Sequence, residues 1–423
     1  MLMSKKGGLR AALLASACVA ALGATAGSAV AAPTCVNGSG NPTIMGRGAT
    51  LQNLAQSTWI AAYNAACPTA TKWNIAAYTG GGSGGGLSNY GFNGNPFEFN
   101  GAGNPLQPNE YIGTDDAPFA SSPNPAITNS RSALNTFTGR GAGSSSVVIL
   151  PVAQAAIAII ANPPSGCTLT DIDNDKLEDA FFGASPTTWA AIGGSGTCSA
   201  SVDRVVRSDS SGSTFQFKHY LSTIDNTGTW TGLQSAANNT TWPSGTTLVP
   251  ASGGGGVVTA VSAATGRIGY ANLADVKAAG SPPAILNVQN DGVTPTGGTY
   301  GDPVDGTNAN CGSATYPGAP TTSAANQDWS GVYGGDPDIA NTSGDPAAYP
   351  ICVLTYAVAL EDDATNTGTL AFGASQQDTV QDYLGYVVDN SGTGGQTALA
   401  GKYYRALTPA IRAVAVGNVA LLG

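Results

Sequence analysis

Histidine and closely paired cysteines are nearly missing from this chain. His219 is the only histidine among 423 residues, and no Cys-x-x-Cys pair occurs. Protein zinc and iron sites need several such nitrogen and sulfur ligands, so we expect no metal centre. A serine hydrolase built on this chain would have to take its base from His219.

Long apolar runs are missing after residue 31, because no later stretch reaches the ~20 residues of a membrane span. Residues 1–31 have the pattern of an export signal, with three basic residues before an Ala/Leu-rich stretch that ends in small residues. A lipid anchor at Cys18 is disfavoured because Ala15 stands where a leucine is normally required. We expect a protein exported to the periplasm or the cell exterior.

Charge is scarce, and its balance is acidic. Only 10% of residues are charged, whereas 42% are apolar and 58 are glycine, a composition typical of a folded, secreted protein. Without the three basic residues of the signal, 13 basic residues face 26 acidic ones, a formal charge near −13. This balance argues against a nucleic-acid partner. Local dipoles and individual side chains must therefore hold any bound anion.

An even set of cysteines follows the signal: Cys35, Cys67, Cys167, Cys198, Cys311 and Cys352. In an exported chain these residues predict three disulfides. Six cysteines allow fifteen pairings, and we favour sequential neighbours because each pair then closes a modest loop.

The length after the signal, about 390 residues, exceeds one hydrophobic core and indicates two lobes. Strand and helix patterns alternate, which favours an α/β fold. The charge-free segment 145–164 is typical of a buried strand pair and suits the crossing between lobes. Segment 278–348 is dense in Gly, Pro, Asn, Asp and Thr, so we expect a loop-rich insertion there.

Apolar periodicity predicts the individual elements. Helices are expected at 51–67, 170–183, 213–223 and 379–389, and a terminal helix kinked near Pro409 at 402–422. Strands are expected at 72–79, 110–116, 203–209 and 349–360, and segment 253–273 should form a helix followed by a strand.

The glycine-rich turn 80–86 fits two patterns, the hydrolase elbow GxSxG around Ser83 and the dinucleotide pattern GxGxxG. A dinucleotide-binding site requires an acidic residue about 20 residues after the glycine motif, and the nearest acidic candidates lie ~30 residues after it. We therefore expect no dinucleotide cofactor. The order Ser83, Asp115, His219 is that of a hydrolase. However, His219 lies about two turns inside a predicted helix, where histidine is usually packed or solvated.

The alternating acids Asp171, Asp173 and Asp175 suggest a calcium loop. That loop fails because Lys176 and Phe182 stand where glycine and glutamate are needed. A capped amphipathic helix is the better interpretation.

The segment 205–217, VVRSDSSGSTFQF, places an arginine and small hydroxyl residues where a strand enters a helix. An oxyanion at that point would meet the Arg207 cation, held by Asp209, and the amides and hydroxyls of a helix start. An ordinary helix cap with a salt bridge is the alternative. Ser83 and Thr50, at two further glycine turns, favour a binding site.

Five segments resemble, in order, the phosphate-binding solute receptors of ABC transporters, including their secreted relatives called DING proteins. These segments are GRGATLQNLAQSTWIAAYNAACP, YTGGGSGGGL, IGTDDAPF, VVRSDSSGSTFQFKHYLS and GGGGVVTAVSAATGRIGYANL, and they span most of 46–273. The RSDSSGST motif is specific, whereas the glycine tract alone is not. The resemblance implies a two-lobed periplasmic-binding-protein fold of type II, with mixed sheets flanked by helices and the ligand in the cleft between lobes.

The resemblance also implies the boundaries of the lobes. The first lobe would comprise 32–151 and the returning segment 349–423, and the second lobe would comprise 152–348 with the insertion 278–348. We expect a monomer that passes inorganic phosphate to a membrane permease and performs no chemistry on it.

Matching motifs carry the family's ligand contacts over to this sequence. The implied phosphate-binding residues are Thr50, Leu51, Ser83, Asp116, Arg207, Ser211, Gly212 and Ser213, with Asp209 supporting Arg207. Leu51 and Ser213 stand where the family usually has phenylalanine and threonine, and both keep a backbone amide available. The doubled Asp115-Asp116 leaves open which carboxylate faces the ligand, and the spacing to Ala117-Pro118 favours Asp116.

A carboxylate suits a phosphate site because phosphate still carries a proton at neutral pH and can donate it. Fully ionised sulfate would instead set a lone pair against the carboxylate, at a cost of several kcal/mol. Two other classes of function stay open at this point. One is a secreted serine hydrolase or esterase using Ser83 and His219, and the other is a secreted structural relative that has lost its ligand.

Overall fold

The computed structural model describes residues 33, 35, 44–67, 75–89, 110–115, 147–182, 187–225, 240–243, 247–293, 298–325, 327–329, 331–361 and 374–422. The expected export signal with Cys18 lies outside the described residues, and so does Asp116.

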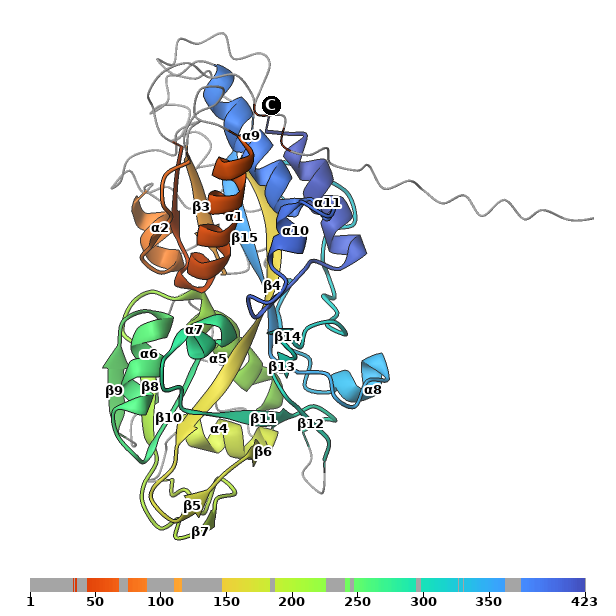
Figure 1. The fold of residues 1–423 in the computed structure, drawn as a ribbon. Helices are drawn as coiled ribbons and strands as arrows, with labels where there is room; N and C mark the ends of the chain where they lie inside the picture. The colour runs from red at the N-terminus through yellow and green to blue at the C-terminus, as the bar shows by residue number, and fades with distance from the viewer. Residues whose placement is uncertain are drawn as a thin grey trace, which may run out of the picture.

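The central strand β4 (Val147–Asn162) runs through both halves of the molecule (Figure 1). Its first part pairs antiparallel with β15 (Cys352–Leu360), and its second part with β10 (Arg267–Asn272). All but its last residue are buried, as expected for a strand with both faces covered. The segment 145–164 is therefore one continuous strand rather than the expected pair, because it contains no turn between two apolar runs.

The half drawn at the top of Figure 1 holds the N- and C-terminal elements around one end of this sheet. Its strands are β1 (Met45–Gly48), β2 (Thr79–Gly80) and β3 (Glu110–Thr114), in the order β2-β1-β3-β15-β4. Its helices are η1 (Thr50–Gln52), α1 (Asn53–Ala66), α2 (Ser83–Asn89), α9 (Ala374–Val388), α10 (Gly395–Ala398) and α11 (Pro409–Val419). Buried bonds connect distant segments, such as that from Asn418 Nδ2 to the Ile149 carbonyl at 2.8 Å.

The other half extends the sheet from β4 through β10 to β8 (Asp203–Arg207) and β9 (Leu248–Ala251). Helices α4 (Asn174–Phe182), α5 (Gly212–Ile224), α6 (Gly253–Ser262) and α7 (Leu273–Ala278) surround these strands (Figure 1). Phe217 packs against Tyr270 and Phe181, with ring centroids 4.6 and 4.8 Å away. Predictions at 170–183, 213–223 and 253–273 are confirmed within a few residues.

The segment 278–348 is mostly irregular, as expected, but two of its strands, β11 (Ala284–Gln289) and β12 (Tyr300–Gly301), belong to the large sheet. β11 pairs with β4 and with the short β6 (Asp171–Ile172). The remaining short elements are β5 (Cys167–Thr168), β7 (Ser195–Gly196), β13 (Val304–Asp305), β14 (Asn308–Ala309), α8 (Ile339–Ser343) and β16 (Tyr404–Arg405).

The terminal helix begins at Pro409 instead of being kinked there. Thr408 caps it, because its hydroxyl accepts the Ile411 amide, and proline fits the first helical turn, where its missing N–H costs nothing. The residues Tyr404 and Arg405 before this helix form strand β16, which pairs antiparallel with β4. The predicted helix from 402 onward was therefore wrong in its first turns.

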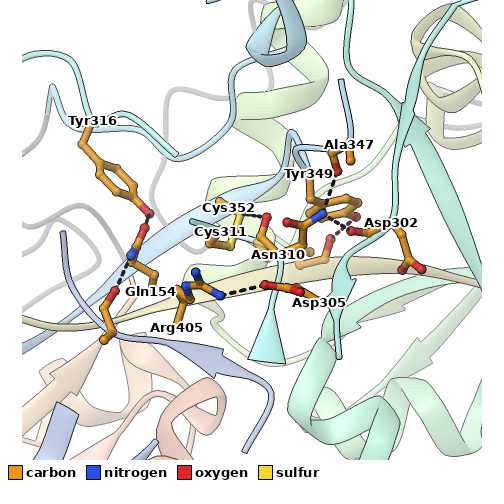
Figure 2. The surroundings of a disulfide bond; sticks show 12 residues. Gln154, Asp302, Asp305, Asn310, Cys311, Tyr316, Ala347, Tyr349, Cys352 and Arg405 are labelled. Atoms are coloured by element: carbon orange, nitrogen blue, oxygen red, sulfur yellow. Dashed lines mark hydrogen bonds and ion pairs between the residues drawn. A yellow bond between two sulfur atoms is a disulfide. The ribbon is translucent and has the colours of Figure 1, made fainter. Parts of the chain in front are cut away.

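Disulfides join sequential neighbours, which confirms the favoured pairing: Cys35–Cys67, Cys167–Cys198 and Cys311–Cys352. Figure 2 shows the third bond, which ties the irregular segment to the first residue of β15. Beside it, Asn310 Nδ2 donates to the Ala347 carbonyl at 2.7 Å, and Arg405 pairs with Asp305 at 2.8 Å. The insertion is thus anchored where β15 enters the sheet.

Candidate anion-binding site

Arg207 is the last residue of β8 and supplies a buried cation, with only 2% of its side chain exposed. Its Nε donates to Asp209 Oδ1 at 2.7 Å, and its Nη2 donates to Oδ2 of the same carboxylate. Burial by itself lowers the pKa of Arg207, but the hydrogen bond and charge of Asp209 outweigh it and raise that pKa. Nη1 makes no hydrogen bond within the described residues, so its two N–H donors are left for a ligand.

The first turn of α5 follows directly. Ser211 is its N-cap, in extended conformation, and its hydroxyl accepts the Thr214 amide at 3.3 Å. Gly212 and Ser213 are the first helical residues, so the positive end of the helix dipole lies beside Arg207. The arrangement matches the expected strand, turn and helix start.

Asp115, at the end of β3, brings a carboxylate against this turn. Ser213 Oγ donates to its Oδ2 at 2.9 Å, and Ser83 Oγ donates to its Oδ1 at 3.1 Å. Gln216 Nε2 donates to its backbone carbonyl at 3.0 Å. Burial raises the pKa of Asp115, and the hydrogen bonds of Ser213 and Ser83 and the charge of Arg207 oppose that rise. Of the adjacent pair, Asp115 therefore places its carboxylate at this turn, and the favoured Asp116 lies outside the described residues.

The two glycine-rich turns touch each other. Gly82 has φ +81°, and a Cβ placed on it would lie 2.3 Å from the Ser210 carbonyl oxygen. Only a glycine allows the backbones to approach so closely. Ser83, the next residue, begins α2 and is fully buried. Ser83 and Ser213 thus meet the same carboxylate from opposite turns.

A third glycine turn completes the site. The Gly253 amide, at the start of α6, donates to Asp209 Oδ1 at 3.1 Å. A Cβ placed on Gly253 would lie 3.8 Å from the Thr50 methyl carbon, so Thr50 faces this turn. The buried Leu51 is held by its carbonyl, which accepts from Asn272 Nδ2 at 3.1 Å and from the Tyr404 hydroxyl. Contacts within the described residues thus connect Thr50 to the Asp209–Arg207 pair through Gly253, and Ser83 to Ser213 through Asp115.

Sequence reasoning missed several members of this region. Tyr270 accepts the Arg207 amide at 3.4 Å and shares a 2.6 Å hydrogen bond with the Thr214 hydroxyl. Gln216 and Gly253 make the contacts described above. The glycines that begin α6 were the only sequence signal for this third turn, and nothing local distinguishes Tyr270 from an ordinary core tyrosine.

His219 does not join Ser83. Its ring stacks on Tyr333, with centroids 3.4 Å apart and planes at 5°. Burial lowers its pKa to about 4, and its imidazole makes no hydrogen bond within the described part of the chain. The Ser83 hydroxyl instead donates to Asp115. A Ser83–His219 hydrolase site is therefore not assembled here.

No group of three or more His, Cys, Asp or Glu side chains among the described residues is arranged for a metal ion. In the rejected calcium loop, Asp171 accepts from Asn287 and Asp173 accepts from Tyr300. None of the described helices combines the length and apolarity needed to span a bilayer.

Residues 24–391 match the family model of the PBP superfamily domain. The phosphate-binding protein PstS 3 of Mycobacterium leprae is 29% identical over 224 residues, which are 51% of this chain and 52% of that protein. The chain thus matches about half the length of this relative.

Two solved structures have a similar fold. A high affinity periplasmic phosphate-binding protein, PfluDING, has a TM-score of 0.59 at 23% identity, over 90% of this chain and 98% of that one. A phosphate-binding protein from Stenotrophomonas maltophilia has a TM-score of 0.59 at 18% identity, over 89% and 93%. These similarities confirm the expected α/β fold of periplasmic phosphate-binding proteins. Each of the proteins compared is named as a phosphate-binding protein.

Proposed function

The chain belongs to the PBP superfamily, and we propose that it captures inorganic phosphate outside the cytoplasm for an ABC-type transporter. One observation carries this proposal: the buried Asp115 carboxylate shares a single region with the Arg207 guanidinium and the start of α5. An anion site that also contains a carboxylate suits an anion that brings its own proton.

Phosphate meets both requirements of such a site. Its charge is offset by Arg207 and the helix dipole. The hydroxyls of Ser83 and Ser213 donate to Asp115 in this structure and would turn to the phosphate oxygens when the phosphate proton takes their place on the carboxylate. Its remaining proton at neutral pH can be donated to a carboxylate oxygen. Sulfate has no proton to donate at that pH, so its oxygen would face the carboxylate lone pairs unpaired.

The ligand contacts proposed are Thr50, Leu51, Ser83, Arg207, Ser211, Gly212 and Ser213, with Asp209 holding Arg207 and a carboxylate from the pair at 115 and 116. Asp115 has the support of its contacts with Ser83 and Ser213. The motif spacing supports Asp116. Replacing each by asparagine separately is the way to decide between them.

Calorimetry with phosphate and then with sulfate, near neutral pH, tests the function. Wild type should release heat with phosphate and none with sulfate, and Arg207→Ala should abolish phosphate binding because the compensating cation is gone. Asparagine at the true ligand carboxylate should admit sulfate, whereas asparagine at the other position should leave selectivity unchanged. Absence of heat with phosphate in the wild type would exclude the proposal and favour a structural relative.

Delivery to a membrane permease, export by residues 1–31 and a monomeric state complete the proposal. The proposed lobes are 32–151 with 349–423, and 152–348. The change of partner along β4, from β15 to β10, supports a crossing near the middle of that strand. Deleting the gene should lower phosphate uptake by the producing cell when phosphate is scarce.

A further inference from the structure

Asp275, in the first turn of α7, has one carboxylate oxygen that accepts no hydrogen bond from the described residues. Its Oδ2 is buried and has no hydrogen-bond partner among the described residues, although the residue as a whole keeps some exposure. A Cβ placed on Gly254 would lie only 2.0 Å from this oxygen. An ionised carboxylate packed in this way loses hydration without a replacement, so the position favours the neutral acid.

Asp275 lies beside the anion site. Gly254 follows Gly253, whose amide donates to the Asp209 carboxylate that holds Arg207. The charges of Arg207 and Asp115 both act on the Asp275 carboxyl group. A change of charge at the site therefore shifts the pKa of Asp275. The Asp275 carboxyl group makes no hydrogen bond or ion pair in the described residues.

The elements packed on α7 bring few other titratable groups. Neither α6 nor β4 contains one. On β10, the Tyr270 hydroxyl shares a hydrogen bond with the Thr214 hydroxyl, and the Arg267 guanidinium donates to the Ala260 carbonyl. The Tyr404 hydroxyl donates to Leu51, and Lys277 of α7 lies over the Tyr403 ring.

Burial is the main cause that raises the pKa of Asp275, to about 7. Arg207 opposes this rise, and Asp115 adds to it. Arg207 offsets one negative charge, but the same region also contains the carboxylates of Asp209 and Asp115, so a doubly charged phosphate entering the site adds to an excess of negative charge. That charge raises the pKa of a neighbouring acid further.

We propose that Asp275 takes up one proton from solvent when phosphate binds, which removes a negative charge from the wall of the site. The proposal rests on the phosphate-binding function proposed above. Asp275 acts on the site through its charge rather than by direct contact, because Gly254 and Gly253 lie between it and the Asp209–Arg207 pair.

The pH range of the effect follows from the two pKa values of Asp275, without and with phosphate. Below the value without phosphate, Asp275 is protonated in both states and binding takes up no proton there. Between the two values, binding takes up a proton, and the affinity falls by up to about tenfold per pH unit. Above both values, the carboxylate stays ionised and the affinity stays low.

Calorimetry with inorganic phosphate in two buffers of different ionisation enthalpy, about one pH unit above neutrality, measures the protons taken up. Phosphate's own ionisation contributes equally to every variant, so differences between variants isolate Asp275. Asp275→Asn should take up about one proton fewer than wild type and should bind phosphate up to about tenfold more tightly at that pH. Asp203→Asn, at the opposite end of β8 from Arg207, is the matched control and should behave as wild type.

The outcomes separate the two proposals. If the wild type binds no phosphate, the proposed function fails. If it binds phosphate but Asp275→Asn takes up as many protons as wild type, the role of Asp275 is overturned and the function stands. Should Asp275→Asn fail to fold, the wild-type carboxyl group can be followed by carbon NMR with and without phosphate. A pKa of Asp275 that does not move on binding would overturn the proposal equally.

Discussion

The Ser213 hydroxyl donates to Asp115 Oδ2 across 2.9 Å, which connects the first turn of α5 to the end of β3. Ser83, from the other glycine-rich turn, donates to the second oxygen at 3.1 Å. One buried carboxylate thus joins two turns that lie more than a hundred residues apart in the sequence. Its protonation state should control both the closure of these turns and the choice of anion.

Acidification should weaken the exclusion of sulfate. Burial raises the pKa of Asp115, against the opposing effects of Ser213, Arg207 and Ser83. As the pH falls through this raised value, the carboxyl group gains a proton that it can donate to sulfate. Sulfate affinity should then rise by up to about tenfold per pH unit until the carboxyl group is fully protonated.

Calorimetric titration of sulfate over a series of pH values checks this expectation. Asp115→Asn is the control, because an amide donates at every pH and its sulfate affinity should not follow that titration. A wild type that excludes sulfate equally at all pH values would show that Asp115 is not the selecting carboxylate. Asp116→Asn would then be the variant to titrate.

Alanine at Gly82 should damage binding far more than alanine at its neighbour Gly81. A Cβ at Gly82 would overlap the Ser210 carbonyl oxygen, and φ +81° costs a residue other than glycine about 1–2 kcal/mol. The turns must therefore separate, and we expect at least a tenfold loss of phosphate affinity. At Gly81 an added Cβ meets nothing within 4 Å.

Affinity and thermal unfolding of both variants can be measured side by side. Gly81→Ala should match wild type in both. A Gly82→Ala variant that binds phosphate normally would mean that the two turns need not touch when the ligand is bound.

The sequence predicted most elements of this fold because apolar periodicity and helix caps are local signals. The sequence also predicted the strand-to-helix turn that carries Arg207, Asp209 and Ser211, since these residues lie within a few positions of one another. The long β4 was mistaken for two strands because a strand buried on both faces has no alternation to mark its length. Pro409 was placed inside a helix because apolar residues continue on both sides of it.

Other features depend on tertiary contacts and have no local signature. Asp115 and Asp116 are adjacent, and a shift of one residue at the end of a strand turns a side chain to the opposite face. Motif spacing alone therefore leaves the choice open. Asp275 belongs to no recognisable pattern, and only the close approach of Gly254 reveals that its oxygen is buried.

Removing the Cys311–Cys352 disulfide should affect phosphate binding as well as stability. Cys352 pairs with Ala156 of β4, next to the point where Asn272 of β10 pairs with Ile157. The bond thus holds the insertion at the place where the partner of β4 changes (Figure 2). Loosening it should alter the orientation of the strands that carry Asp115 and Arg207.

The Cys167–Cys198 bond provides a matched comparison, because it closes a loop of similar length, with a sequence separation of 31 against 41. It lies at the paired strands β5 and β7, away from the site. Replacing both cysteines of either bond by alanine should lower the free energy of unfolding by about 2–4 kcal/mol, because the unfolded chain regains loop entropy. Denaturant unfolding measures this loss in each variant. Only the Cys311/Cys352 variant should also lose phosphate affinity in calorimetry. Equal losses of affinity in the two variants would mean that general destabilisation, rather than the position of this bond beside the crossing in β4, weakens the site.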